Sequence, residues 1–401
     1  MKSELLLNVQ LIAGTALLLL LAALVFLLIE KVRKRRALAG SVQTCAPAFP
    51  FPQSSHPAPA GGHFFPPQEA LDATLRDAYS HWLEAFLLPD AEAGRAFVRA
   101  GVARHWLRYQ LTAGSFTQAL GMLLCVLMAG ADPLAQTRFD ALLAFCLSRP
   151  AADHPDLMSW QVMPDVVPGA RLNADPRAEA WQAYALLCAA AQWTRSARFD
   201  YARLAAQRLD ALLELRQALS ASAEYARIPA RLARLFSRVG APAWQKAAAE
   251  AEKAEVAFWK RHPDFSGMDA QLRIEAAGLG LAQGLCPAGL PAESRELAAL
   301  PAGFLQEALS EIRESTAEET QSDLPDAETL SAFSLLACYG IAAAGPESSE
   351  LAREYWEELS GQQAKAGSAV EASLRLLAMA ALSGRIWFSE ALGAKALPQE
   401  Q

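Results

Sequence analysis

The side chains in this sequence that could do chemistry are carboxylates, aromatic rings and arginines, because the usual metal and nucleophile patterns are missing. The six histidines form neither an HExxH motif nor a pair at i and i+4, and no two cysteines are spaced as CxxC. There is also no GxGxxG, Walker A or GxSxG motif. We therefore expect no metal, no nucleotide and no other cofactor. The scattered cysteines are typical of small core side chains, which mildly favours a reducing compartment.

Asp269 is the carboxylate in the most informative setting. It directly precedes AQLRIEAAGLGLA, an apolar-periodic run that is typical of a helix. A carboxylate at this position can act as a general base on water, or it can cap the helix that follows. The two roles are compatible, and the sequence leaves both open.

Four aromatic residues could form a wall on which sugar rings stack. They are Trp160, Trp181, Tyr184 and Trp193. Aromatic side chains at helical spacing more often fill a core. We expect Tyr184 and Trp193 to be core residues, whereas Trp160 and Trp181 fit either role equally well.

Several stretches, taken in order, resemble segments of the family 8 glycoside hydrolases, whose members include the endoglucanase of bacterial cellulose synthesis. The strongest is SFTQALGMLLCVLMAG, which starts at Ser115 and is followed by FDAL from Phe139. LMSW at 157–160, with Pro164 and Asp165, is similar to a family turn. NADPRAEAWQAYALL, from Asn173, is similar to a third segment. Weaker matches lie at 229–244, 267–270 and 373–385, so the resemblance spans most of the chain after residue 82.

The resemblance implies an inverting hydrolysis of β-glycosidic bonds, which needs one carboxylic acid and one carboxylate base about 6.5–9.5 Å apart. Aligning the segments places Phe116 at the position of the general acid and Asp269 at that of the base. Arg177 falls on an aspartate that would contact sugar, Glu179 keeps an acid two positions on, and the family arginine is displaced to Arg273. The resemblance implies substrate contacts from Trp160, Arg177, Glu179, Trp181 and Arg273.

Phe116 has no proton to donate, so the resemblance predicts a degenerate catalytic pair. Loss of a general acid costs a factor of about 10² to 10⁴ in rate. A relocated acid is the alternative, and Asp90 and Glu92 are the candidates upstream.

The elements that must position these residues are predicted to be helices. From Glu69 onward the chain consists of Ala/Leu-rich stretches with apolar residues at i, i+3, i+4 and i+7, and no stretch alternates for long enough to indicate a strand. No fixed repeat is present. We expect an all-α domain over residues 69–395 with a short tail at 396–401. The family resemblance implies an (α/α)6 barrel.

The N-terminal part predicts a membrane anchor and a linker. Residues 11–29 read LIAGTALLLLLAALVFLLI, which is long enough to cross a bilayer, and Lys31 and Arg33 to Arg36 follow. A cleaved signal peptide is the alternative, although basic residues stand where a cleavage site would be. Residues 1–38 are thus predicted to be a single-pass anchor. The Pro-rich residues 39–68 are predicted to be a semi-extended spacer that holds the domain off the membrane.

Charge and resemblance give conflicting indications of location. The basic cluster places the domain in the cytoplasm by the positive-inside rule, whereas family members process exported glucan and imply the periplasmic face of a bacterial inner membrane. We weakly favour the cytoplasm. The net charge of -7 gives no support for a nucleic-acid partner.

Three hypotheses follow from the sequence. The first is a membrane-anchored, catalytically degenerate family 8-like protein that binds a polysaccharide chain or proteins of an exopolysaccharide (cellulose-type) biosynthesis machinery. The second is an active endo-β-1,4-glucanase with a relocated acid. The third is an unrelated α-helical scaffold for protein interactions, whose sequence matches are coincidental.

Overall fold

The computed structural model describes most of the predicted helical domain. The described residues are 45–53, 66–105, 108–164, 171–218, 228–262, 270–285, 353, 356–357, 359–360, 369–388 and 392. The predicted anchor and the predicted tail lie outside these ranges. None of the helices within the ranges combines the length and apolar character needed to cross a bilayer.

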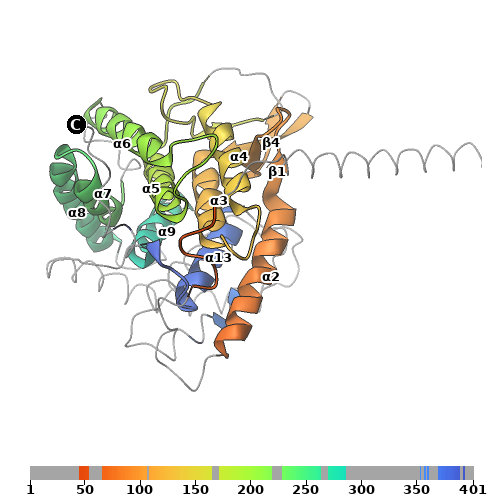
Figure 1. Cartoon of the computed structure of the whole chain (residues 1–401). Helices are drawn as coiled ribbons and strands as arrows, with labels where there is room; N and C mark the ends of the chain where they lie inside the picture. The colour runs from red at the N-terminus through yellow and green to blue at the C-terminus, as the bar shows by residue number, and fades with distance from the viewer. Residues whose placement is uncertain are drawn as a thin grey trace, which may run out of the picture.

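Helices make up most of the described chain, as the sequence predicts (Figure 1). They are α2 (Gln68–Phe86), α3 (Ser115–Leu127), α4 (Ala135–Leu147), α5 (Pro176–Gln192), α6 (Tyr201–Ala218), α7 (Ala230–Val239), α8 (Ala243–Arg261), α9 (Ala270–Leu285) and α13 (Ala369–Leu382). Helices α3, α5, α7, α9 and α13 contact one another in that order, and α13 also contacts α3. Helices α2, α4, α6 and α8 pack outside α13, α3, α5 and α7 respectively. This double ring of helices is the arrangement of an (α/α) barrel.

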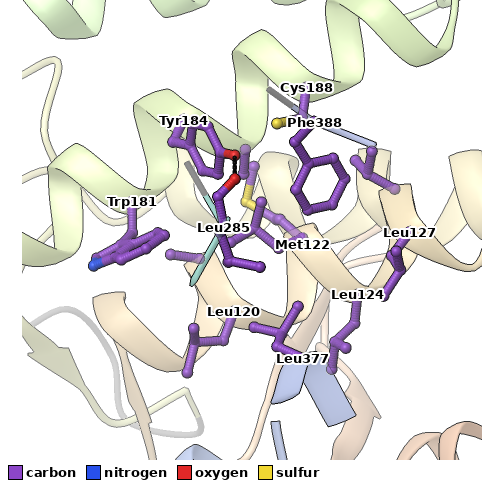
Figure 2. Packing of buried hydrophobic residues seen from close by; sticks show 14 of the residues in the cluster. Leu120, Met122, Leu124, Leu127, Trp181, Tyr184, Cys188, Leu285, Leu377 and Phe388 are labelled. Atoms are coloured by element: carbon purple, nitrogen blue, oxygen red, sulfur yellow. Dashed lines mark hydrogen bonds between the residues drawn. The ribbon is translucent and has the colours of Figure 1, made fainter. Parts of the chain in front are cut away.

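The inner and outer helices differ in how much of their surface is apolar. Helix α3 is SFTQALGMLLCVL, and all its side chains except Phe116 are buried, because neighbours surround it on every side. Helix α2 buries only one stripe, which includes Leu71, Leu75 and Trp82. Figure 2 shows buried residues of α3, with Met122 toward Tyr184 of α5 and Leu124 toward Leu377 of α13.

Short antiparallel strands are the part of the fold that the sequence analysis did not predict. They are β1 (Leu87–Pro89), β2 (Ala96–Val98), β3 (Gly101–His105), β4 (Arg108–Gly114) and β5 (Gln161–Val162). β1 pairs with β2, and β3, β4 and β5 form a second sheet in that order. The two hairpins join the end of α2 to the start of α3, so they lie at one end of the barrel.

Two poles of the barrel can be distinguished because α3 and α5 run parallel. Near their starts, Gln182 Nε2 donates to the carbonyl of Ser115 at 3.2 Å, and near their ends Gln192 Nε2 donates to the carbonyl of Val126 at 2.9 Å. We call the end with the strands and the starts of α3 and α5 the strand pole. The opposite end, where α3, α5 and α13 finish, is the strap pole (Figure 1).

Residues 45–53, which we call the strap, pack across the strap pole and do not act as a spacer. Exposed residues alternate with less exposed ones along the strap, as in an extended chain. Phe49 stacks on Trp387 with ring centroids 4.3 Å apart, and Phe51 is only 4% exposed. Gln192 Nε2 donates to the carbonyl of Phe49 at 2.9 Å, while the Phe49 N–H donates to Gln192 Oε1 at 2.7 Å. The prediction that residues 39–68 form a spacer is therefore wrong for the strap, because its proline-rich composition hid a buried apolar face.

A buried ion pair joins the two ends of the described barrel at this pole. Arg385 donates from Nε and Nη2 to the two carboxylate oxygens of Asp72 in α2, at 2.7 and 2.6 Å. Arg385 also donates to the carbonyl of Gln53, and Gln53 Nε2 donates to the carbonyl of Arg385. The strap, the first helix and the end of α13 are thus held by one group of polar contacts.

Replacing Gly130 with alanine should dislodge the strap. Gly130 has a φ of +104°, and a Cβ there would lie 2.8 Å from the Phe51 amide nitrogen. We expect Gly130→Ala to lower the free energy of unfolding by about 1–3 kcal/mol in urea denaturation, because backbone strain and overlap add. The matched control is Gly94→Ala, also at positive φ, whose Cβ would meet nothing closer than 3.7 Å. Equal losses in the two variants would show that the strap contact contributes nothing.

The cysteines should differ sharply in reactivity. Cys125, Cys146 and Cys188 are buried, as expected for core residues, and burial raises the pKa of Cys125 and of Cys146 to about 12. Cys45 is partly exposed, and its hydrogen bond with the Thr194 hydroxyl lowers the pKa of its thiol.

Cys286 and Cys338 lie outside the described residues. In a Cys286→Ser/Cys338→Ser variant, we therefore expect one thiol to react with Ellman's reagent at pH 8 before unfolding and three more to react in denaturant. Reaction of a second thiol in the folded state would contradict the burial of the three core cysteines.

Candidate functional site

Three of the sequence segments that carry the family resemblance meet at the strand pole. The Ser115 N–H donates to the carbonyl of Trp160 at 3.0 Å, and the Trp160 N–H donates to the carbonyl of Asn173 at 2.9 Å. Ser159 forms a β-bridge with Ala174. The start of α3, the turn at 157–160 and the start of α5 are therefore adjacent, although they are well separated in the chain.

Phe116 lies in the first turn of α3, at the position that the resemblance assigns to the general acid. The helix begins after Gly114 because Thr117 Oγ1 accepts from the Gly114 N–H at 3.2 Å and donates to the Gly114 carbonyl at 2.7 Å. The Phe116 ring is half-buried and packs on the edge of the hydrophobic core. This position offers an apolar face and no proton.

Trp160 is an exposed aromatic residue of this pole. Its side chain is 48% exposed, whereas its N–H and carbonyl are both bonded to neighbouring segments. The main chain at Trp160 is therefore fixed by two neighbouring segments, while its side chain is open to solvent. Its predicted role in stacking against sugar is compatible with this position and stays a prediction.

Arg177 is held by its own helix cap. Asp175 begins α5, and its Oδ1 accepts from the Arg177 backbone N–H at 3.0 Å. The guanidinium folds back on the same carboxylate, with Nε 3.3 Å from Oδ1 and Nη2 3.4 Å from Oδ2. A sugar contact by Arg177 would have to compete with this ion pair.

Glu179 is buried, which contradicts its predicted contact with substrate. Its side chain has no exposed surface and forms an ion pair with Arg208 of α6, which is 3% exposed. Burial lowers the pKa of Arg208 to about 10, so the guanidinium remains charged at neutral pH. Gln182 Nε2 also donates to Glu179 Oε1 at 3.4 Å. Glu179 thus supports the packing of α5 on α6, and no sugar can reach it without moving the helices.

Trp181 is also a core residue and is not available to stack on sugar. It is 1% exposed, and its ring meets that of Tyr184 edge to face with centroids 5.8 Å apart (Figure 2). The predicted core positions of Tyr184 and Trp193 are confirmed, since they are 0% and 2% exposed.

The other half of the predicted site cannot be placed beside Phe116. Asp269 lies outside the described residues, one position before α9 begins. Arg273 belongs to α9, but its side chain lies outside the described part. Their roles as base and as substrate contact stay predictions from the resemblance.

The two candidates for a relocated acid both have basic partners. Asp90 follows β1 with its side chain 2% exposed, and its Oδ2 lies 3.8 Å from Arg149 Nη2. Glu92 is exposed and pairs with Arg95 at 2.8 Å. Each carboxylate is thus already engaged by an arginine, and a sugar would have to compete with that pair for it. Within the described ranges no three His, Cys, Asp or Glu residues gather closely enough to hold a metal ion.

Gln182 is a positioning residue that the sequence analysis missed. It is fully buried on α5, and its amide bonds the Ser115 carbonyl at the very start of α3. Glu179 and Gln182 are polar residues three positions apart within the apolar run AEAWQAYALL. Residues three positions apart lie on one face of a helix. Two polar residues on one face of an apolar helix were the signal in the sequence that both are buried and hydrogen-bonded.

Removing the Glu179 carboxylate should destabilise the barrel strongly. Glu179→Ala leaves the buried Arg208 guanidinium without its partner, so we expect the free energy of unfolding to fall by roughly 3–5 kcal/mol. Glu92→Ala, which breaks an exposed pair with Arg95, is the control and should cost under about 1 kcal/mol. Chemical denaturation measures both changes. Similar values for the two variants would mean that the Glu179 pair is not buried in solution.

Comparison with known proteins agrees with this geometry. No protein-family model matches the chain. A beta-glucanase of Niallia circulans is 30% identical over 176 residues, which is 42% of this chain and 40% of that protein. An endoglucanase of Bacillus sp. (strain KSM-330) is 29% identical over 136 residues, 33% of this chain and 29% of that protein. The matched region therefore spans less than half the length of either curated relative.

Solved structures match over much more of the chain. The apo beta-1,3-1,4-glucanase from Paenibacillus sp. X4 superposes with a TM-score of 0.59 and 17% identity, covering 85% of this chain and all of that one. A cold-adapted family 8 xylanase gives a TM-score of 0.58 with 15% identity, covering 84% and 97%. The chain has the fold of a family 8 glycoside hydrolase. Because the identities are below 20%, these matches show a shared fold and no more, and they support the predicted barrel.

Proposed function

We propose that this family 8-like protein is attached to a membrane and binds a β-glucan chain at the strand pole, without hydrolysing it by the family's acid–base mechanism. The observation that carries the proposal is Phe116 in the first turn of α3. The family mechanism needs a carboxylic acid at the position that the resemblance assigns to this residue.

The ion pairs at the start of α5 support the loss of catalysis. Asp175 is used as a helix cap and as the partner of Arg177, and Glu179 is buried against Arg208. A proton donor must reach the glycosidic oxygen within hydrogen-bond distance and must be protonated. These carboxylates lack either the freedom or the exposure to do so.

Aromatic surface supports the retention of binding. Trp160 is half exposed, and its backbone is bonded to Ser115 and Asn173. Phe116, the residue after Ser115, adds a second, partly buried ring. Aromatic faces stack favourably on the apolar faces of sugar rings, and that contact needs no acid. A β-glucan is proposed as the ligand because the sequence relatives are named as a beta-glucanase and an endoglucanase.

The membrane part of the proposal comes from the sequence. The apolar run at 11–29, followed by five basic residues, supports a single-pass anchor, and a polysaccharide-synthesis complex would be a fitting partner. The location is tested with a reporter protein fused to the C-terminus. A reporter that is active only in the cytoplasm should be active if the domain is cytoplasmic and inactive if it is periplasmic. The coincidental-scaffold hypothesis is set aside, because the family 8 fold extends over most of the chain.

Binding is tested by calorimetric titration of the full chain in detergent with cellohexaose. We expect saturable binding, and Trp160→Ala should weaken it about tenfold, which corresponds to ~1.4 kcal/mol. The control is Val102→Ala, which removes another exposed apolar side chain of the strand pole. Absence of saturable binding by the wild type, or equal binding by Trp160→Ala and wild type, contradicts the proposed site.

Hydrolysis is tested by release of reducing ends from carboxymethylcellulose. We expect none from the wild type and some from Phe116→Glu, because that variant restores a carboxylic acid to the start of α3. Phe116→Gln is the matched control, since it has similar size and polarity but no acid. Release by the wild type that is lost in Asp269→Asn would instead establish an active endo-β-1,4-glucanase with a relocated acid.

A further inference from the structure

We infer that the strap pole faces the bilayer and that the strand pole, with the candidate glucan site, faces away from it. This orientation rests on the membrane attachment included in the proposed function. It follows from where the chain enters the barrel, which the strap fixes.

The strap shortens the connection between the basic cluster and the barrel. Only eight residues, 37–44, separate Arg36 from Cys45. A fully extended chain of that length spans at most about 30 Å. The connection is therefore residues 37–44, which we call the leash, and not the 30-residue spacer expected from composition. Cys45 must lie close to any membrane that holds residues 11–29.

The strap is attached at several points along its length. The Cys45 N–H donates to Gln136 Oε1 at 2.6 Å, the Ala48 N–H donates to the Gln192 carbonyl at 2.8 Å, and the Phe51 N–H donates to the Ala129 carbonyl at 2.6 Å. Releasing the strap would also expose Phe51 and separate it from the core. The entry point therefore stays at the strap pole while the domain is folded.

The outer surface of the strap suits a position near lipid headgroups. The exposed residues are Ala46, Ala48, Pro50 and Pro52, and none of them is charged. These four residues therefore bring no acidic side chain that anionic lipid headgroups would repel. The basic cluster that precedes the leash favours the same close approach.

The candidate site lies at the other end of the inner helices. Helix α3 starts beside Trp160 and ends beside the strap, where Ala129 bonds Phe51. Its 13 residues span about 20 Å at 1.5 Å per residue. A polymer chain would therefore reach Trp160 and Phe116 from the aqueous side.

The test compares the distance of two fluorescent probes from the bilayer in the full chain. Ala48→Cys places a probe on the strap, and Val102→Cys places one on β3 at the strand pole, where the side chain is 62% exposed. Each is made in a Cys45→Ser/Cys286→Ser/Cys338→Ser background, in which the remaining three cysteines are buried. The labelled proteins are reconstituted into phosphatidylcholine–phosphatidylglycerol vesicles with a rhodamine-labelled lipid as the acceptor.

We expect energy transfer to the lipid acceptor to be several-fold more efficient from Ala48→Cys than from Val102→Cys. Insertion of a flexible Gly/Ser segment of about 20 residues between Arg36 and Cys45 should remove most of that difference, because the leash then no longer restricts the domain. Equal transfer without the insertion, greater transfer from Val102→Cys, or a difference that the insertion leaves unchanged would overturn the orientation.

Failure of membrane attachment is distinguishable from failure of glucan binding. If neither probe shows transfer and the protein does not float with vesicles in a density gradient, both the orientation and the membrane part of the proposed function are wrong. The calorimetric titration with cellohexaose is independent of that result, so glucan binding stands or falls on its own measurement.

Discussion

The bidentate ion pair between Asp72 and Arg385 is the contact through which the described barrel closes. Asp72 lies in the first outer helix and Arg385 follows the last inner helix, so this contact joins residues 313 positions apart. Both side chains are more than nine-tenths buried, and the third guanidinium nitrogen of Arg385, Nη1, donates to the strap carbonyl of Gln53. Buried charges must be fully paired, because each unpaired one would cost several kcal/mol. The first helix, the last helix and the strap must therefore assemble together, and the ring of helices between them has its ends fixed.

The sequence predicted the helical class because local patterns are sufficient for it. The apolar run of α3 and the amphipathic stripe of α2 are visible without any knowledge of their neighbours. The strap was not predicted, although its inward residues alternate, because composition suggested a solvated linker and the surfaces that bury Phe49 and Phe51 belong to helix ends far along the chain. The short strands were missed for a similar reason, since their pairing partners define them more than their own residues do.

The structure contradicts the predicted substrate contacts of Glu179 and Trp181, which are buried, while the roles of Phe116, Asp269 and Arg273 stay predictions. Backbone hydrogen bonds bring Ser115, Trp160 and Asn173 together, and the sequence alone did not predict this adjacency. Glu179 was misassigned because its partner Arg208 is on the next helix, and a buried acid and an exposed acid look the same in a sequence. Phe116 could be interpreted from sequence alone, because the absence of a carboxyl group is a chemical fact that no environment changes.

Because the leash is short, several copies of the protein in one membrane could together retain a glucan chain that each copy binds only weakly. Copies of the protein in one membrane would hold their strand poles at the same height and facing the same way. A long glucan lying above them could then be held by several copies at once, each additional contact being made at a high effective concentration. A single site with low affinity would be sufficient to retain such a polymer. Retention would then depend on the surface density of the protein more than on the affinity of any one barrel.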